Sequence, residues 1–449
     1  ELAATPGMAE APAKCREMSL LYAPQGASCR RVLTVGCGPA EAFNAARLRA
    51  SLAAAARLAR ERGVAKLCVW LGGLPLPCGV AVREAALALR FGLYRFLELK
   101  SDVDVPADPD EALLLVEGRE DEASAALRLG EAEAAGLGLA RDLINRPSNH
   151  ATAGQLAEEA RELAARHGFS CQVMDRAAIE SLGMGAFAAV AQGSRSEPCF
   201  VVLDTDPDGG RPLCLVGKGV TFDTGGISLK PAAKMEEMKS DMAGAAAVLG
   251  CFESLGALGA PRRVVGLLPL TDNMPDGGSV KPGDVVRTLS GLTVEIINTD
   301  AEGRLLLADA LAFAARLEPE LVVDVATLTG AARVALGVHY AALFCPDEAL
   351  AARLRALGEP LGDKLWPMPL DELYAKELES DVADLKNVGR REGGAIIAAM
   401  FLKRFAPEGA AWAHLDIAPT AFQDAASDFW AKGATGFGVR TLLALARGE

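Results

Sequence analysis

Lysine and aspartate side chains interrupt a glycine-rich and otherwise apolar stretch at 216–230, VGKGVTFDTGGISLK. Its chemically versatile residues are Lys218, Asp223 and Lys230. Glycines at this density permit close backbone approach and unusual dihedral angles, which an ordinary surface loop does not require. On its own, however, the stretch is equally consistent with a turn that carries solvated charges.

A second stretch, IINTDAEGRLLLADAL at 296–311, carries Asp300, Glu302 and Arg304 at every second position. If it begins extended, all three side chains project to one side, although an exposed helix cap with a salt bridge is the alternative. Carboxylates among apolar residues are costly to bury unless they are paired or bind a metal. The stretch therefore points to an ion pair or a metal site.

A further acidic residue, Asp241, opens an alanine-rich helix in MKSDMAGAAAVLG at 238–250. In isolation its plainer interpretation is an N-cap, which stabilises a helix by ~1 kcal/mol. Together the three stretches supply four carboxylates, enough to hold two divalent cations ~3.5–4 Å apart, which would stabilise an attacking oxygen and a developing oxyanion. The four are Asp223, Asp241, Asp300 and Glu302.

Composition restricts what kind of protein and site this is. The chain has 449 residues, 51% of them hydrophobic and 23% charged, which predicts a folded globular protein of more than one domain. A net charge of −13 disfavours nucleic-acid binding, because an acidic surface repels phosphate. The four histidines include no close pair, so oxygen ligands would have to hold any metal.

The sequence also favours a reducing, non-membrane environment. Ten cysteines without a CxxC pair are interpreted as buried free thiols. No uncharged apolar run reaches the ~18 residues of a membrane span, and the start lacks a signal-peptide pattern, so we expect a soluble cytoplasmic protein. Because the chain begins with Glu1 rather than Met, we also expect it to be truncated at its start.

Strand-like and helical segments alternate along the chain. In the first third, apolar strands at 30–38 and 66–74 are separated by helices at roughly 43–62 and 81–98, a spacing typical of parallel sheets with helical crossovers. We expect an α/β fold with two domains, each a mixed, mainly parallel sheet flanked by helices. The expected domains are an accessory domain with a connecting helix at 1–140 and a larger catalytic domain at 141–449.

The larger domain begins with two apolar segments, 199–206 and 212–222, which are joined by PDGG and predict a β-hairpin. Apolar strands follow at 262–270, 292–298 and 321–328, each leading into a loop and a helix. Open α/β sheets bind ligands beyond the carboxyl ends of their strands. The charged stretches follow such strands and are therefore the candidate site.

These stretches resemble the catalytic signatures of the leucyl aminopeptidase family, the M17 cytosolic aminopeptidases. The octapeptide NTDAEGRL at 298–305 is highly specific to that family, and similarity continues through VATLTGA, ADLKNVG, WAHLDIA and GATGFGVRTL. The resemblance covers essentially all of 140–449 and, more loosely, 30–140. It implies a metal-dependent aminopeptidase that removes Leu, Met and similar apolar residues from the N-terminus of peptides.

The resemblance implies two divalent ions per subunit, Zn or Mn in the first place and Mg or Co as alternatives, with a metal-bridging hydroxide as the nucleophile. To bind a metal, Lys218 would have to be a neutral amine, which requires a pKa far below the usual value of ~10.4. The implied ligands are Lys218, Asp223, Asp241 and Glu302 for one ion, and Asp223, Asp300 and Glu302 for the other.

Further residues take their implied roles from the same resemblance. Lys230 would stay protonated and polarise the scissile carbonyl, while Arg304 would orient a bicarbonate that acts as general base. An apolar pocket would receive the side chain of the N-terminal residue. Its implied members, with backbone groups contributed near Leu328 and Gly330, are Met238, Thr327, Leu328, Gly330, Ala418 and Ala421.

Three positions depart from the usual family pattern, namely Arg146, Ala243 and Pro419. None is an implied ligand, so we expect activity to survive, although Pro419 could alter the shape of the pocket. The alternative is a catalytically inactive paralogue with a structural or DNA-binding regulatory role, which the intact set of ligand positions disfavours. Peptides are the expected partners, and a homo-hexamer of two trimers is implied by resemblance alone.

Overall fold

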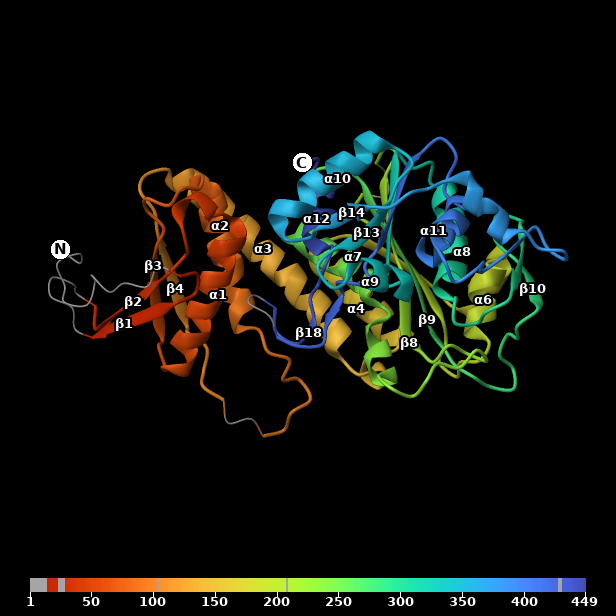
Figure 1. The fold of residues 1–449 in the computed structure, drawn as a ribbon, viewed down its shortest axis with the longest axis horizontal. Coiled ribbons are helices and arrows are strands. Elements are labelled where there is room, and N and C mark those ends of the chain that lie inside the picture. Colours follow the sequence, from red (N-terminus) through yellow and green to blue (C-terminus); the bar gives the residue numbers. More distant parts are fainter. Residues whose placement is uncertain (1–13, 23–28, 103–104, 207–208, 427–429) are drawn as a thin grey trace. The chain divides into compact units, whose positions relative to one another are not determined.

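The structure is a computed structural model, which describes residues 14–22, 29–102, 105–206, 209–426 and 430–449 (Figure 1). The chain forms two compact units, both of the α/β type that the sequence predicts. Glu1–Ala134 and Ala425–Lys432 belong to the smaller unit, and Ala135–Asp424 and Gly433–Glu449 belong to the larger one.

The described part of the smaller unit contains two pairs of strands, two long helices and the first part of a third. Leu48 and Leu52 of α1 pack with Leu71 and with residues of α2 in its core. Asn44 caps the first helix by accepting a hydrogen bond from the backbone of Arg47 at 3.1 Å. The elements are the antiparallel pair β1 (Met18–Tyr22) and β2 (Arg31–Val35), η3 (Ala40–Ala42), α1 (Ala45–Glu61), the parallel pair β3 (Lys66–Trp70) and β4 (Glu111–Leu115), and α2 (Cys78–Leu93).

A nine-stranded mixed sheet forms the centre of the larger unit. Its order is β14-β13-β16-β12-β7-β9-β6-β5, with β8 paired to β9, and the four central strands β16, β12, β7 and β9 are parallel to one another. The strands are β5 (Ser170–Met174), β6 (Cys199–Asp204), β7 (Leu213–Gly217), β8 (Gly219–Asp223), β9 (Val264–Asn273), β12 (Leu321–Ala326), β13 (Ala341–Phe344), β14 (Leu365–Pro367) and β16 (Ala411–Asp416).

Helices cover both faces of this sheet (Figure 1). On one face lie α4 (Ala153–His167), α7 (Ala243–Leu258) and α12 (Val439–Ala446), and on the other lie α6 (Gly185–Ala191), α8 (Gly303–Ala315) and α11 (Gly394–Lys403). The remaining helices are α3 (Glu120–Asn145), within which the division between the units falls, η4 (Ser148–His150), α5 (Arg176–Leu182), η5 (Met235–Ser240), α9 (Gly330–Leu336), α10 (Glu348–Leu361) and η6 (Glu372–Leu378).

Two small sheets complete the larger unit. The three-stranded one contains β10 (Asp284–Arg287), β11 (Thr293–Ile296) and β15 (Leu385–Lys386), and the two-stranded one contains β17 (Phe422–Gln423) and β18 (Gly433–Ala434).

By length and composition Met235–Leu258 would be able to cross a membrane, yet 78% of its most apolar stretch is buried in the protein, as in a core helix.

The predicted hairpin at 199–206 and 212–222 is wrong. Strand β9 lies between β6 and β7, antiparallel to the first and parallel to the second. The segment 212–222 is also divided at Lys218, where β7 ends and β8 begins. An apolar strand buried on both faces accepts partners on both edges, and local turn residues do not reveal which strand will occupy an edge.

The cysteines were expected to be buried, and this holds for few of them. All ten are free, but only Cys214 and Cys251 are fully buried, while Cys29 and Cys68 are exposed. Cys68 lies on a strand whose alternate side chains face outward, so an apolar run there indicated a strand without indicating burial.

Candidate metal centre

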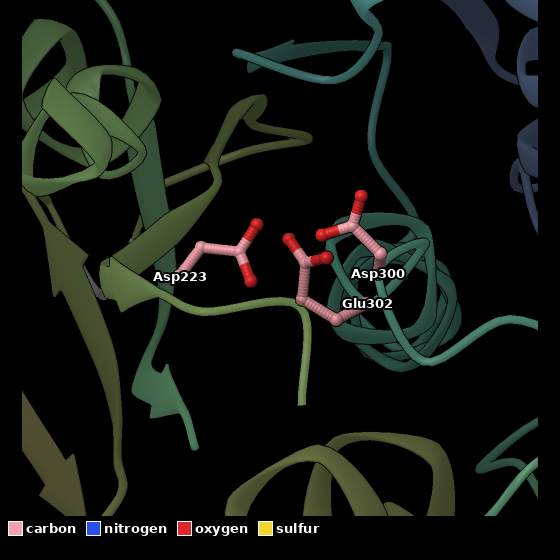
Figure 2. Close-up of side chains that lie close together, drawn as sticks. All are labelled: Asp223, Asp300 and Glu302. Carbon is pink, nitrogen blue, oxygen red and sulfur yellow. The ribbon is translucent and has the colours of Figure 1, made fainter. Parts of the chain in front are cut away.

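Three acidic side chains from two separate segments of the chain face one another (Figure 2). Asp223 is the last residue of β8, Asp300 lies between β11 and α8, and Glu302 directly precedes α8. Oxygen atoms of all three lie within 4.8 Å of one another. The structure therefore brings together two of the charged stretches that are separate in the sequence.

Lys218 connects these carboxylates to the third stretch. Its buried Nζ lies 2.7 and 2.8 Å from the two carboxylate oxygens of Asp241 and 2.8 Å from Oε1 of Glu302, and it donates to the backbone oxygen of Thr327 at 3.0 Å. The side chain passes so close to Gly303 that a Cβ there would lie 2.4 Å from Cε of the lysine. A residue without a side chain is therefore required where α8 begins.

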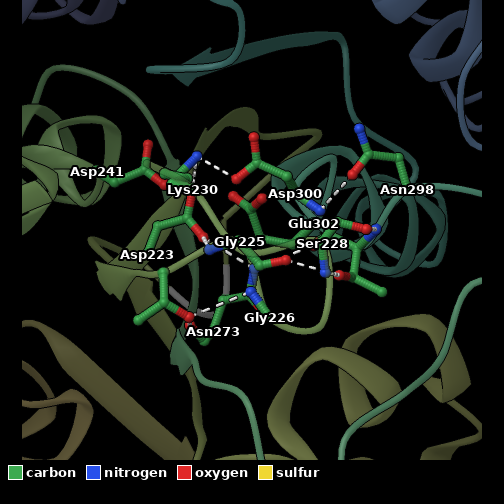
Figure 3. A network of polar contacts seen from close by, with 12 residues as sticks. Asp223, Gly225, Gly226, Ser228, Lys230, Asp241, Asn273, Asn298, Asp300 and Glu302 are labelled. Atoms are coloured by element: carbon green, nitrogen blue, oxygen red, sulfur yellow. Dashed lines mark hydrogen bonds and ion pairs between the residues drawn. The ribbon is translucent and has the colours of Figure 1, made fainter. Parts of the chain in front are cut away.

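Lys230 is a second lysine in contact with the cluster (Figure 3). Its Nζ is 2.6 Å from Oδ2 of Asp223 and also forms an ion pair with Asp300. About a fifth of the lysine side chain and a third of the Asp300 side chain are exposed, so this side of the cluster is open to solvent. Each lysine thus bridges carboxylates that come from different stretches of the chain.

The glycines after Asp223 permit the tight approach that their density suggested. Gly225 and Gly226 have φ of +88° and +63°, which side chains rarely allow. A Cβ on Gly225 would lie 2.8 Å from Oδ1 of Asp300. The loop therefore reaches the second acidic stretch because these residues have no side chains.

The electrostatic balance of the cluster is negative, because two lysines offset only two of four carboxylates. Burial, reinforced by Glu302, raises the pKa of Asp223 to about 6, and burial raises the pKa of Asp241 well above its usual value. Burial would also raise the pKa of Glu302, but the charges of Lys218 and Lys230 outweigh it and lower that pKa. For both lysines, burial favours the neutral amine, yet the carboxylates raise the pKa above its ordinary value.

This donor set fits divalent cations. Surplus carboxylate charge that is largely shielded from water is costly unless cations compensate it, and oxygen ligands suit Mn and Mg as well as Zn. The ammonium groups of Lys218 and Lys230 now supply part of that compensation. A neutral Lys218 would offer its lone pair at the position where its Nζ already lies.

Arg304 occupies the first turn of α8 and is almost fully buried. Burial lowers the pKa of its guanidinium to about 10. One nitrogen, Nη1, donates to the backbone oxygen of Asn387 at 2.7 Å, whereas Nε has no hydrogen-bond partner among the described residues. A buried guanidinium with an unpaired donor is suited to holding a small anion.

Comparisons with known proteins agree with this geometry. The catalytic-domain model of the cytosol aminopeptidase family matches residues 138–443, and the N-terminal-domain model of the same family matches residues 5–103. The chain belongs to the cytosol aminopeptidase family. It is therefore a metal-dependent aminopeptidase of the M17 type, which the motifs had indicated.

Relatives of the cytosol aminopeptidase family match over most of the chain. A probable cytosol aminopeptidase of Syntrophobacter fumaroxidans is 48% identical, over 99% of this chain and 90% of its own length. A probable cytosol aminopeptidase of Nitratidesulfovibrio vulgaris is 50% identical, over 96% of this chain and 87% of its own length. Among solved structures, the bottromycin maturation enzyme BotP in complex with Mn has a TM-score of 0.91 and 40% identity, over 98% of this chain and 95% of that chain. Family, acidic cluster and the Mn-bound neighbour are consistent with two divalent ions, Zn or Mn.

The residues expected to form the side-chain pocket lie within or beside several elements. Thr327 follows β12, and its hydroxyl donates to Oδ1 of Asp241 at 2.7 Å. Met238 lies in η5, Leu328 and Ala418 are half-buried, and Gly330 is exposed at the start of α9. Ala421 is 1% exposed, so its side chain is enclosed by the chain.

Sequence reasoning missed the polar residues that hold these segments in place. They were overlooked because an asparagine, threonine or aspartate at a strand end is commonplace, although three of them lie within stretches that resemble the family. Asp416 accepts hydrogen bonds from the backbones of Leu328 and Ala418, each at 3.1 Å. The missed residues are Asn273, Thr299, Asn387 and Asp416.

Proposed function

We propose that this chain is a leucyl aminopeptidase, which hydrolyses the peptide bond after an N-terminal Leu, Met or similar apolar residue. The observation that supports this best is the convergence of the charged side chains from three separate stretches on one partly open centre. The proposed ligands of one ion are Lys218, Asp223, Asp241 and Glu302, and those of the other are Asp223, Asp300 and Glu302.

When bound, the ions would supply Lewis acidity that activates water and polarises the carbonyl of the scissile bond. Lys230 is proposed to remain protonated, since the surrounding carboxylates raise its pKa. Its partly exposed ammonium can donate to the substrate carbonyl and stabilise the negative charge that develops there. Without Lys230 the oxyanion would lose a charged donor on the open side of the centre.

Arg304 is proposed to orient a bicarbonate that acts as general base. Its guanidinium is fixed by Asn387 and keeps Nε free of hydrogen bonds among the described residues. A planar anion held by this fork would accept a proton from the attacking water. Selectivity for the N-terminal residue would follow from recognition of its free α-amino group at the same centre.

The side-chain preference is assigned to the segment after β12, the loop after β16 and η5. Small or apolar residues there leave room for Leu or Met but offer no charge to pair with Asp or Lys. The value of kcat/KM for Leu and Met anilides should therefore exceed that for Asp and Lys anilides. Equal or faster turnover of the charged substrates would contradict the assignment. The proposed lining is Met238, Thr327, Leu328, Gly330, Ala418 and Ala421.

Metal analysis tests the ligand assignment directly. Purified Asp241→Asn and Glu302→Gln should each lose bound Mn or Zn relative to the unaltered protein. Asp363→Asn is a suitable control, since Asp363 is also a buried carboxylate but bonds to Thr441 rather than to the cluster. Full retention of metal in both ligand variants would refute the assignment.

Three wider proposals accompany this function. The names of the relatives support a cytoplasmic location, family resemblance supports a homo-hexamer, and the expected division assigns 1–140 to an accessory domain and 141–449 to catalysis. Light scattering on the purified chain tests the hexamer, and a mass near that of one subunit, 46.7 kDa, would refute it.

A further inference from the structure

Two loops bring carboxylates into the centre, and both carry negative charge. Asp223 ends β8, whereas Asp300 and Glu302 lie between β11 and α8. Their oxygens come within 4.8 Å of one another, a distance at which like charges repel. The two loops therefore need to be held together by hydrogen bonds from neutral side chains.

Asn273 is one such attachment, and it lies beside Asp223 in Figure 3. The side chain is 2% exposed, and its Nδ2 donates both to Oδ1 of Asp223 at 2.8 Å and to the backbone oxygen of Thr299 at 3.0 Å. Its own backbone oxygen accepts from the hydroxyl of Thr224 at 2.7 Å. One neutral amide thus joins the two loops and leaves Oδ2 of Asp223 directed toward the cluster, where Lys230 contacts it.

Thr299 is the second attachment and immediately precedes Asp300. Its hydroxyl donates to the backbone oxygen of Gly225 at 2.6 Å and accepts from the backbone nitrogen of Ser228 at 2.8 Å. Its backbone nitrogen donates to Oγ of Ser228 at 3.2 Å. The loop that carries Asp223 is therefore fastened to the loop that carries Asp300 by three bonds at one threonine.

We propose that Asn273 and Thr299 are positioning residues, which set the spacing of the two carboxylate loops and thereby the capacity of the centre for two ions together. This rests on the proposed ligand set and extends it to residues that touch neither substrate nor metal. Loss of hydrogen bonds that orient ligands typically lowers metal affinity by about 10- to 100-fold. Both residues should therefore matter for metal binding before any effect on catalysis is considered.

Titration of the 449-residue chain with Mn²⁺, followed by electron paramagnetic resonance, tests this without an activity assay. Thr299→Val removes the hydroxyl at nearly constant volume, Thr299→Ser restores it, and Asn273→Leu removes the amide. The matched control is Thr288→Val, because Thr288 is also 2% exposed and donates to the backbone oxygen of Leu292 at 2.9 Å, away from the cluster.

The expected result for Thr299→Val and Asn273→Leu is a rise in the Mn²⁺ Kd of about 10- to 100-fold. The spectrum should also change from that of a spin-coupled pair to that of isolated ions. Thr299→Ser and Thr288→Val should keep both the wild-type Kd and the coupled spectrum. If Asn273→Leu does not fold, the three threonine variants decide the matter.

Two outcomes would overturn the proposal, and they are distinguishable. Wild-type affinity and coupling in Thr299→Val, alongside metal loss in Asp223→Asn, would refute the positioning role and leave the ligand set intact. Wild-type metal binding in Asp223→Asn and Glu302→Gln as well would refute the ligand set, and the positioning role with it.

Discussion

Asp416 offers the sharpest test of how the proposed pocket is held together. Its Oδ1 accepts backbone hydrogen bonds from Leu328, Thr329 and Ala418 at 3.1, 3.4 and 3.1 Å, and its Oδ2 accepts from the hydroxyl of Thr329 at 2.7 Å. One fully buried carboxylate thus joins the segment after β12 to the loop after β16. These are two of the segments assigned to the substrate side chain.

The substitution Asp416→Asn keeps the shape but removes the charge and one acceptor. If the amide oxygen faces the three backbone nitrogens, the amide nitrogen faces the hydroxyl of Thr329, which already accepts from Ala332 at 3.0 Å. Hydrogen bonds to a charged group stabilise by about 1.5–3 kcal/mol and neutral ones by about 1. We therefore expect this network to lose about 2 kcal/mol of hydrogen-bond free energy. If the whole of that loss falls on binding of the substrate side chain, kcat/KM falls by roughly 30-fold, which is the upper limit.

The assay is steady-state hydrolysis of a leucine anilide by the Mn-loaded enzyme. The fall should appear mainly as a higher KM, since the proposed metal ligands are untouched, and the Mn²⁺ Kd should not change. Asp363→Asn is the matched control, because that buried carboxylate also accepts from a threonine backbone and hydroxyl, at 3.2 and 2.9 Å in Thr441. A loss of thermal stability like that of the control, with wild-type KM, would refute the pocket role.

Three further predictions address the metal, the electrophile and the pH dependence. Chelation should abolish peptidase activity and added Mn or Zn should restore it; activity that survives exhaustive chelation contradicts a metal enzyme. Lys230→Met should lower kcat by about 10²–10³ at unchanged metal content, whereas Lys234→Met, which removes an exposed lysine, should not. Burial raises the pKa of Asp309 from 3.8 to about 7, so its contribution to the free energy of unfolding should fall by at most about 4 kcal/mol as pH rises through that interval. Between about pH 5 and about pH 8 this amounts to at most about 3 kcal/mol, so the free energy of unfolding in urea should fall by that much more in the wild type than in Asp309→Asn, and equal falls would refute it.

The local elements were predictable because their signals are local. The helix expected at 43–62 is found at Ala45–Glu61, and the strand expected from residue 66 begins there. Apolar periodicity and capping residues act over a few positions, so they fix where an element lies. Pairing between strands is not local, which is why the insertion of β9 between β6 and β7 left no trace in the turn residues.

Part of the gathering of the charged stretches was also foreseeable from general topology, although the stretch with Asp300 and Glu302 follows β11, which belongs to the separate three-stranded sheet. Parallel strands end at a common edge, so residues that follow β7 and β12 must approach one another. The backbone of Lys218 indeed donates to Val325 of β12 at 3.0 Å, which brings its side chain to Thr327 and Asp241. Topology could not predict that Asn273 and Thr299 would hold these loops together. An amide or hydroxyl group has a structural role only through the groups to which it forms hydrogen bonds in the folded chain.

The ion pairs of the lysines and the hydrogen bonds of the neutral side chains differ in whether they can remain when metal binds. Lys218 and Lys230 hold the carboxylates together as ammonium ions, and Lys218 would have to give up its proton to become a ligand. The contacts of Asn273 and Thr299 involve no proton that must leave and no charge that an ion would replace. They can therefore maintain the same loop spacing with lysine or with metal as the counter-charge. That persistence is the physical reason to expect that their removal weakens metal binding, even though neither residue is itself a ligand.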